Sequence, residues 1–188
     1  MQTETTKNLF TVDEYDSMFD AGILDREARV ELIEGEIFLM AGPGPFHVAC
    51  VNRATSVMVP ALAGKAIVSI QNPLRLDRYS EPQPDIVLLK PRADFYASER
   101  FTAADTFMVV EVADSSFLFD LNRKLPLYAR LGVPEVWIED LRGGMILVYR
   151  DRVGEAYATS LVYHRGDTMS IAAFPDIPFK VDDLLGSE

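Results

Sequence analysis

The sequence has little cysteine, no long apolar run and few basic residues. Cys50 is the only cysteine among 188 residues, which excludes an internal disulfide and a cysteine-based zinc cage and fits a reducing compartment. We expect its thiol to be buried. The polar start MQTETTKN lacks the pattern of a signal peptide, and no later run approaches the ~18 apolar residues of a membrane span. We therefore expect a cytoplasmic protein.

Positive charge is also scarce, because 29 acidic residues face 18 basic ones and the formal net charge is -11. Phosphate contacts supply most of the sequence-independent affinity for nucleic acid. Strong nonspecific binding to nucleic acid is therefore not expected. Carboxylates gathered around a divalent cation, or a local basic patch, remain compatible with this balance.

The length and the apolar content of 48% fit one hydrophobic core. We expect a flexible N-terminus over residues 1–9 and a single domain over residues 10–188. Glycine and proline separate short segments, and the chain contains no internal repeat. This pattern is typical of a mixed α/β domain.

The N-terminal third predicts a helix, a hairpin and a second helix. Thr11 and Glu14 form a capping box that opens a short helix, which Gly22 closes. Residues 29–41 alternate around a Glu34–Gly35 turn and predict a hairpin. Its expected inward positions are Val30, Leu32, Ile37 and Leu39. Apolar residues recur at helical spacing over residues 47–62.

The remainder predicts a sheet interrupted by one helix. A strand is expected over residues 67–76, and the continuous apolar runs 85–89 and 107–112 predict central strands buried on both faces. A helix over residues 120–131 ends at Gly132. Further strands are expected at 136–138, 145–149 and 157–163, before a short acidic C-terminal piece. The fold class is α/β (α+β), with helices flanking a mixed sheet.

Asp85 and Glu111 each place a carboxylate in an otherwise apolar strand, where an unpaired charge is costly. Two carboxylates on adjacent strands repel each other unless a divalent cation or a basic side chain lies between them. Mg²⁺ takes oxygen ligands and keeps waters that serve as nucleophiles, so it is the economical interpretation. The structural alternative is that Asp85 caps its strand after Pro84 and that Glu111 ends its strand in solvent or in a salt bridge.

Several motifs follow one another in an order that identifies a family. They are Glu31-Leu-Ile-Glu-Gly-Glu36, His47 at a helix start, Pro84-Asp85, Val110-Glu-Val112 with Ser115, Asp120-x-x-x-Lys124-x-x-x-Tyr128 and Gly132-Val-Pro-Glu-Val-Trp-Ile138. This order resembles the bacterial Uma family (DUF820-type) of restriction-endonuclease-like proteins over nearly the whole chain. The resemblance implies the PD-(D/E)XK nuclease fold, in which two acids on neighbouring strands hold a divalent metal and a lysine assists.

The resemblance assigns roles to individual residues. Asp85 is the first acid and Glu111 the second, and together with the Val112 carbonyl they hold Mg²⁺ (or Mn²⁺). Ala113 occupies the usual lysine position, two residues after the second acid, and Lys124 matches a lysine moved to the following helix. Pro126 disturbs that helix, so either the helix starts near Pro126 and leaves Lys124 in a loop, or it is kinked there.

Acids of the hairpin and one histidine complete the candidate site. One of Glu31, Glu34 and Glu36 completes the metal site or orients a water, and Glu36 is preferred by resemblance. A surface acid of the hairpin is the alternative. His47 is a candidate general base or phosphate contact near a helix N-terminus. A local hydrogen bond is the alternative for His47.

The expected function is metal-dependent hydrolysis of a phosphodiester, with nucleic acid as the substrate. The first rival is a non-catalytic protein that keeps the nuclease fold for binding or regulation, which the net charge, Ala113 and Pro126 favour. The second rival is hydrolysis of a small phosphoester, which needs no long basic track. A homodimer is expected as the assembled state.

Overall fold

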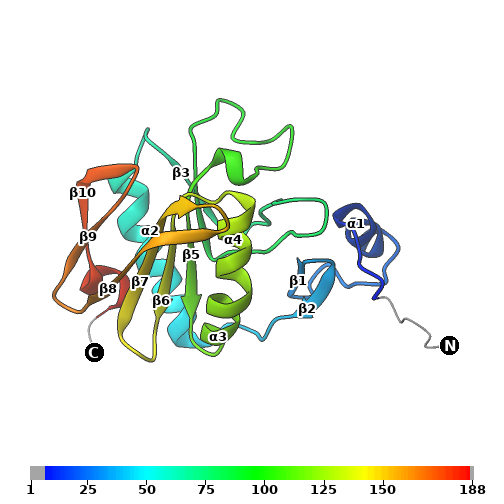
Figure 1. Cartoon of the computed structure of the whole chain (residues 1–188), viewed down its shortest axis with the longest axis horizontal. Helices are drawn as coiled ribbons and strands as arrows, with labels where there is room; N and C mark the ends of the chain where they lie inside the picture. Colours follow the sequence, from blue (N-terminus) through cyan, green and yellow to red (C-terminus); the bar gives the residue numbers. More distant parts are fainter. Residues whose placement is uncertain (1–6, 187–188) are drawn as a thin grey trace.

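Helices cover both faces of a six-stranded mixed sheet in the computed structural model, which describes residues 7–186 (Figure 1). Residues 1–6, which make up most of the N-terminus expected to be flexible, lie outside the described part, as do residues 187–188. No helix within residues 7–186 has both the length and the apolar character needed to cross a membrane.

The strands of this sheet lie side by side in the same order as in the sequence. Its strands, in spatial order, are β3 (Ile67–Ile70), β4 (Ile86–Leu89), β5 (Thr106–Ala113), β6 (Val136–Asp140), β7 (Met145–Val153) and β8 (Ala156–His164). Only β5 and β6 pair in parallel, because the chain between them crosses over through helices. Strand β4 is wholly buried and β5 nearly so, as their apolar runs predict.

Each face of the sheet has its own core. Helix α2 (Pro45–Ala61) covers one face, where Met58 packs in a cluster with Trp137. Helix α4 (Leu125–Leu131) covers the other, where Tyr128 packs with Ile138. A 3₁₀ turn, η1 (Ala103–Asp105), leads into β5. Cys50 is fully buried on the α2 side, as expected.

The segment predicted as one helix over residues 120–131 is built differently. It begins with α3 (Phe117–Phe119), continues as a π-helical turn, η2 (Asp120–Lys124), and ends as α4. The Leu125 N–H donates to the Asp120 carbonyl, five residues earlier. Pro126 stands in the first turn of α4, directly after the π-helical turn, so the helical backbone continues through a residue that has no N–H to donate. Lys124 stays in helical backbone rather than in a loop.

An N-terminal unit formed by α1 (Val12–Asp20), β1 (Val30–Ile33) and β2 (Glu36–Leu39) lies beside the sheet (Figure 1). The predicted capping box of Thr11 and Glu14 is present, and the predicted hairpin forms with the expected turn. Leu39 was predicted to point inward, which is wrong, because it is 79% exposed. The apolar cluster on α1 reaches Val30 and Ile37 but not Leu39.

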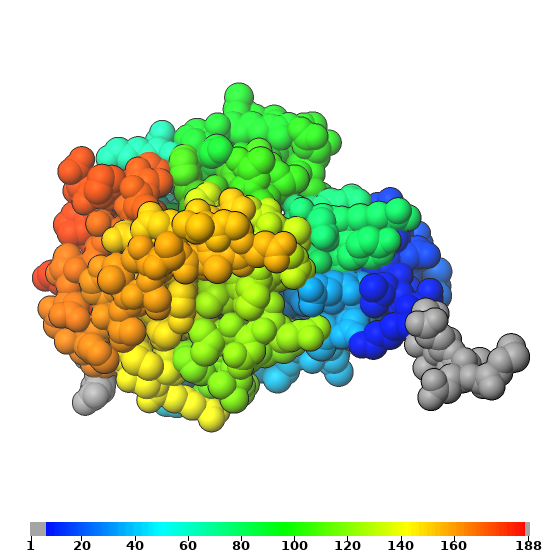
Figure 2. Space-filling model, in the orientation of Figure 1, coloured from blue at the N-terminus to red at the C-terminus, as the bar shows by residue number. Residues whose placement is uncertain are grey.

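Backbone hydrogen bonds from the segment after β3 hold the N-terminal unit in place. Val12 donates to the Arg78 carbonyl (2.8 Å), Gly35 to the Tyr79 carbonyl (2.7 Å) and Glu81 to the Leu32 carbonyl (2.8 Å). Figure 2 shows this segment packed against the blue unit. The strand expected over residues 67–76 therefore ends earlier, at Ile70. Gln71 adopts a φ of 51°, which interrupts the extended backbone, and the residues that follow form hydrogen bonds with the N-terminal unit.

The C-terminal part contains structure that the sequence did not predict. Strands β9 (Thr168–Ile171) and β10 (Phe174–Lys180) form a separate two-stranded sheet, followed by α5 (Val181–Leu185). Pro175 and Pro178 make β10 hard to predict from the sequence, because proline is rare inside strands. The register of β10 shifts between Phe174 and Pro178. The Arg53 guanidinium of α2 donates to the Leu184 and Leu185 carbonyls and fixes α5.

Candidate active site

Asp85 and Glu111 are brought together by the pairing of β4 with β5. Ile86 lies opposite Val110 in this antiparallel pair, so the next position along the register places Asp85 across from Glu111. Asp85 is 7% exposed and Glu111 is 3% exposed. At this depth neither carboxylate can rely on water, so each requires a polar or cationic partner inside the protein.

Asp85 receives hydrogen bonds from both sides. The Val112 N–H donates to Oδ2 (2.9 Å), the Gln71 amide donates to Oδ1 (3.2 Å), and Nε2 of His47 lies 2.9 Å from Oδ1. Burial alone would favour the neutral acid, but the hydrogen bond and the charge of His47, with the Val112 N–H, lower the pKa of Asp85 below its ordinary value. Asp85 is therefore an ionised carboxylate at neutral pH.

His47 stands in the first turn of α2 and connects the two strands. Its Nδ1 lies 2.9 Å from the Val112 carbonyl, while Nε2 faces Asp85. Both neighbours are acceptors, a setting that favours the protonated ring. The hydrogen bond to Asp85 raises the pKa of His47, although burial opposes this. Because both ring nitrogens face acceptors of the protein, the ring has neither a free lone pair for a general base nor a free N–H for a phosphate, and this arrangement favours the alternative of a local hydrogen bond.

Lys124 reaches the same region from η2. Its Nζ donates to Glu31 Oε1 (3.0 Å) and to both oxygens of Glu111 (3.2 and 3.3 Å), and it lies 3.7 Å from Asp120 Oδ1. Lys124 is only 2% exposed. Burial opposes its charge, but the carboxylates of Glu111, Glu31 and Asp120 raise the pKa of Lys124 above its ordinary value. It is therefore a fixed ammonium beside the second acid.

Three residues of this cluster were not assigned roles from the sequence. Tyr128 donates to Glu111 Oε1 (2.5 Å), Asp120 accepts from the Ser116 hydroxyl (2.6 Å), and Gln71 contacts Asp85. The spacing Asp120-x-x-x-Lys124-x-x-x-Tyr128 is a signal that places residues 124 and 128 on one face of a helix. Gln71 carries no such signal, because it lies in irregular backbone after β3.

The third acid of the cluster is Glu31, and not the preferred Glu36. Glu31 is 3% exposed and contacts Lys124. Glu36 instead forms ion pairs with Lys7 and, at 3.5 Å, with Arg123. Glu34 forms an ion pair with Arg130 (2.8 Å) outside the cluster. The structure therefore brings Glu31 to the site, whereas Glu34 and Glu36 pair with residues outside the cluster.

The charges of the cluster do not balance. Four carboxylates, those of Glu31, Asp85, Glu111 and Asp120, face two cationic groups, those of His47 and Lys124. Burial raises the pKa of Glu111 well above its ordinary value, although the Lys124 ammonium opposes this. Oε2 of Glu31 is buried without a hydrogen-bond partner in the described residues. Either protonation or an added cation would relieve this excess of negative charge.

The donor atoms of the cluster suit a divalent cation of the magnesium type. Within residues 7–186, no three side chains of histidine, cysteine, aspartate or glutamate are arranged as a metal-binding group. The set implied by the sequence contains only two side chains, Asp85 and Glu111, with the Val112 carbonyl as the third donor. Oxygen-only sets of this size are usual for Mg²⁺, which keeps several of its waters. The oxygens present are thus of the type that such an ion binds, and in this structure the Val112 carbonyl and the Asp85 carboxylate are bonded to His47, Gln71 and the Val112 N–H.

The cluster lines a pocket of about 240 Å³, which we call the inner pocket. Its wall includes Asp85, Glu111, Lys124, His47 and Arg29. Residues 40–44 after β2 and residues 114–116 after β5 also line it. The buried side chains of Asp85, Glu111 and Lys124 therefore line a common pocket.

Comparisons with known proteins identify the family and the fold. The sequence model of the family Uma2, described as "Putative restriction endonuclease", matches residues 12–182. A solved structure described as "a putative nuclease belonging to DUF820", from Anabaena variabilis, is similar with a TM-score of 0.69 and 16% identity, over 94% of this chain and 97% of that one. No curated protein matches the sequence. The predicted fold class is thereby confirmed.

Proposed function

Because this chain belongs to the Uma2 family, whose description is "Putative restriction endonuclease", we propose that it hydrolyses phosphodiester bonds of nucleic acid with the help of a divalent cation. The observation that carries the proposal is the convergence of Asp85, Glu111 and Lys124 on one pocket. A buried cluster with excess negative charge weakens a fold unless a ligand uses it. Clusters of this kind therefore mark functional sites.

Different residues of the cluster would bind the cation and stabilise the negative charge on the phosphoryl group. Asp85, Glu111 and the Val112 carbonyl would hold the cation, which when bound polarises a phosphate oxygen and makes a water nucleophilic at neutral pH. Lys124 presents a fixed positive charge that stabilises negative charge developing on the phosphoryl group. Glu31 and Tyr128 hold Lys124 and Glu111 in their relative positions. His47 orients the Asp85 carboxylate.

The position of Lys124 supports a catalytic role for the cluster. Ala113 leaves no lysine two residues after Glu111, yet Lys124 brings its ammonium to 3.2 Å from the Glu111 carboxylate. Pro126 does not disturb this contact, because it lies in the first turn of α4. The sequence features that favoured a non-catalytic protein therefore have structural explanations, apart from the net charge.

The test is a cleavage assay on single- and double-stranded DNA and RNA with Mg²⁺ or Mn²⁺. Asp85→Asn and Glu111→Gln keep the shape of each side chain and remove its charge. We expect each to lower the rate at least ~100-fold, because a bound cation contributes several kcal/mol to the transition state. Isothermal calorimetry should show weaker cation binding by both variants.

A pair of variants separates the two hairpin acids. Glu31→Gln is expected to lower the rate, since Glu31 holds Lys124, whereas Glu36→Gln is expected to leave it unchanged, because Glu36 pairs with surface residues. Circular dichroism checks that each variant is folded. If the wild type is as inert as Asp85→Asn on every substrate and binds no divalent cation, the proposed function is wrong.

A further inference from the structure

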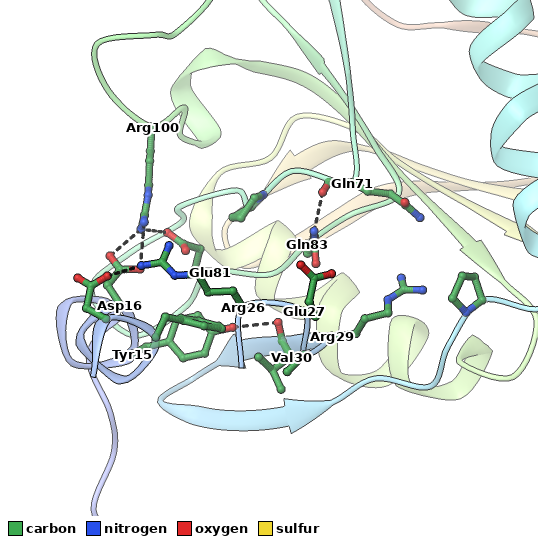
Figure 3. A pocket seen from close by; sticks show the side chains of 15 residues that line it. Tyr15, Asp16, Arg26, Glu27, Arg29, Val30, Gln71, Glu81, Gln83 and Arg100 are labelled. Atoms are coloured by element: carbon green, nitrogen blue, oxygen red, sulfur yellow. Dashed lines mark hydrogen bonds and ion pairs between the residues drawn. The ribbon is translucent and has the colours of Figure 1, made fainter. Parts of the chain in front are cut away.

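The inner pocket continues into a larger one. The second pocket, of about 800 Å³, is called the outer pocket here, and it lies between α1, β1 and the segment 71–83 (Figure 3). Arg29, Pro43 and Gln83 line both pockets. The two cavities therefore form one cleft, with these residues at the junction.

Most arginines around this cleft are already neutralised. Arg26, which lines the outer pocket, pairs with Asp20 (2.8 Å). Arg100 is held more firmly, by Asp16 at 2.9 Å and by the buried Glu81 at 2.7 Å, as Figure 3 shows. A guanidinium paired in this way must lose a carboxylate before it binds a phosphate. These arginines therefore contribute little to binding an anion.

Arg29 differs from these arginines. Its guanidinium has no ion pair or hydrogen bond to any residue between positions 7 and 186, although the residue is half-buried. Figure 3 shows it on the side of the outer pocket opposite Arg100. Arg29 lines the inner pocket together with His47. A half-buried guanidinium without a partner is a suitable donor for a bidentate phosphate contact.

We propose that Arg29 binds a backbone phosphate of an unpaired nucleic-acid strand that runs from the inner into the outer pocket. The inference rests on the proposed function, because the inner pocket then holds the phosphodiester to be cleaved. A strand leaving that pocket through the cleft passes the junction, where Arg29 lies. Arg29 is thus a binding residue of the substrate strand.

Two features select an unpaired strand over a duplex. The carboxylates lie inside a pocket of about 240 Å³, which a single extruded phosphodiester enters more easily than a stiff double helix. Duplex binding needs many phosphate contacts, and Arg29 is the single unpaired arginine lining the cleft among the described residues. The outer pocket is also lined by the aromatic residues Tyr15 and Phe19, and aromatic side chains are the usual partners of unpaired bases.

The experiment measures binding without cleavage. Fluorescence anisotropy of a short labelled oligothymidylate, in EDTA, is compared with that of the same strand annealed to oligoadenylate. The variants are Arg29→Gln, Arg29→Lys and, as a matched control, Arg150→Gln. Arg150 is another half-buried arginine without an ion pair in the described part of the chain, and it lines a different pocket. It therefore controls for the loss of one positive charge.

We expect the wild type to bind the single strand more tightly than the duplex. Arg29→Gln should weaken single-strand binding about ten- to a hundredfold, the range of a charge-assisted hydrogen bond, with Arg29→Lys in between and Arg150→Gln unchanged. The plot of log affinity against log salt concentration should lose about 0.7 of its slope in Arg29→Gln, the value of one single-strand phosphate contact.

The outcomes separate this inference from the proposed function. Equal affinity of Arg29→Gln and the wild type, equal affinity for strand and duplex, or no binding by the wild type would each overturn the role of Arg29. A chain that binds the strand through Arg29 and never hydrolyses it would support this inference and contradict the proposed function. If the wild type cleaves nucleic acid and Arg29→Gln does so with an unchanged KM, the proposed function is supported and the role of Arg29 is contradicted.

Discussion

The buried charge of Lys124 depends on the carboxylates that surround it. Its ammonium is buried and contacts carboxylates of β1, β5 and η2. A buried ion pair adds little net stability, because desolvation opposes the attraction, but removal of one partner leaves an uncompensated charge. Lys124 therefore links the stability of the cluster to its function.

We predict that Lys124→Met lowers the free energy of unfolding by about 3–5 kcal/mol, because Glu31 and Glu111 lose their buried cation. The double variant Lys124→Met with Glu111→Gln should regain a large part of that loss, since one of the two unpaired charges is removed. Urea denaturation of the wild type, both single variants and the double variant measures the coupling. Additive losses would show that the two residues do not interact as the structure indicates.

The acids of the two central strands could be predicted because each interrupts an apolar run, which leaves a clear signal in the sequence. The choice between Glu31 and Glu36 had no such signal. Strand β1 is buried on both sides at its last three positions, so alternation cannot say which of its residues faces the site. Glu31 is recognised only once Lys124 is seen to approach from another element.

At the level of elements, the sequence predicted regular segments and missed irregular ones. The capping box of α1 is a local hydrogen-bond pattern, so it could be predicted from two residues. The π-helical turn Asp120–Lys124 depends on how the chain packs against β1 and β5, and sequence spacing did not reveal it. The segment 71–83 is likewise irregular, because its backbone forms hydrogen bonds with the N-terminal unit and does not pair in the sheet.

The capping box also gives a prediction for the N-terminal unit. Thr11→Ala removes the side-chain oxygen that accepts from Glu14 N–H and should lower the free energy of unfolding by about 1 kcal/mol. Ser17→Ala is the control, because the Ser17 hydroxyl is exposed and bonds only within α1. Urea midpoints of both variants provide the measurement. A loss in Ser17→Ala as large as in Thr11→Ala would remove the capping explanation.

For the whole molecule, buried acids greatly outnumber buried bases. The buried carboxylates belong to Glu31, Glu81, Asp85, Glu111, Asp120, Glu135, Glu139 and Asp140, whereas Lys124 is the only buried lysine or arginine in the described residues. Burial raises the pKa of Glu81, Glu111 and Glu135. A fold that contains such groups binds more protons than its unfolded chain, so its stability falls as the pH rises.

Glu139 allows this pH dependence to be tested at one position. It is fully buried on the α2 side, accepts from the Cys50 thiol, and has no partner for Oε1 among the described residues. Burial raises the pKa of Glu139 from 4.5 to about 7. Between these values the folded chain keeps a proton that the unfolded chain loses, so the free energy of unfolding decreases with rising pH.

We predict that the wild type loses stability from pH 4.5 to about 7, with a contribution from Glu139 of up to ~1.4 kcal/mol per pH unit. Above this range the contribution is constant. Glu139→Gln cannot ionise, so its stability should fall less steeply over the same interval. Urea denaturation in a series of buffers measures both slopes, with Glu155→Gln, in the exposed β7–β8 turn, as the control. Equal slopes for the wild type and Glu139→Gln would show that Glu139 is ionised in the folded protein.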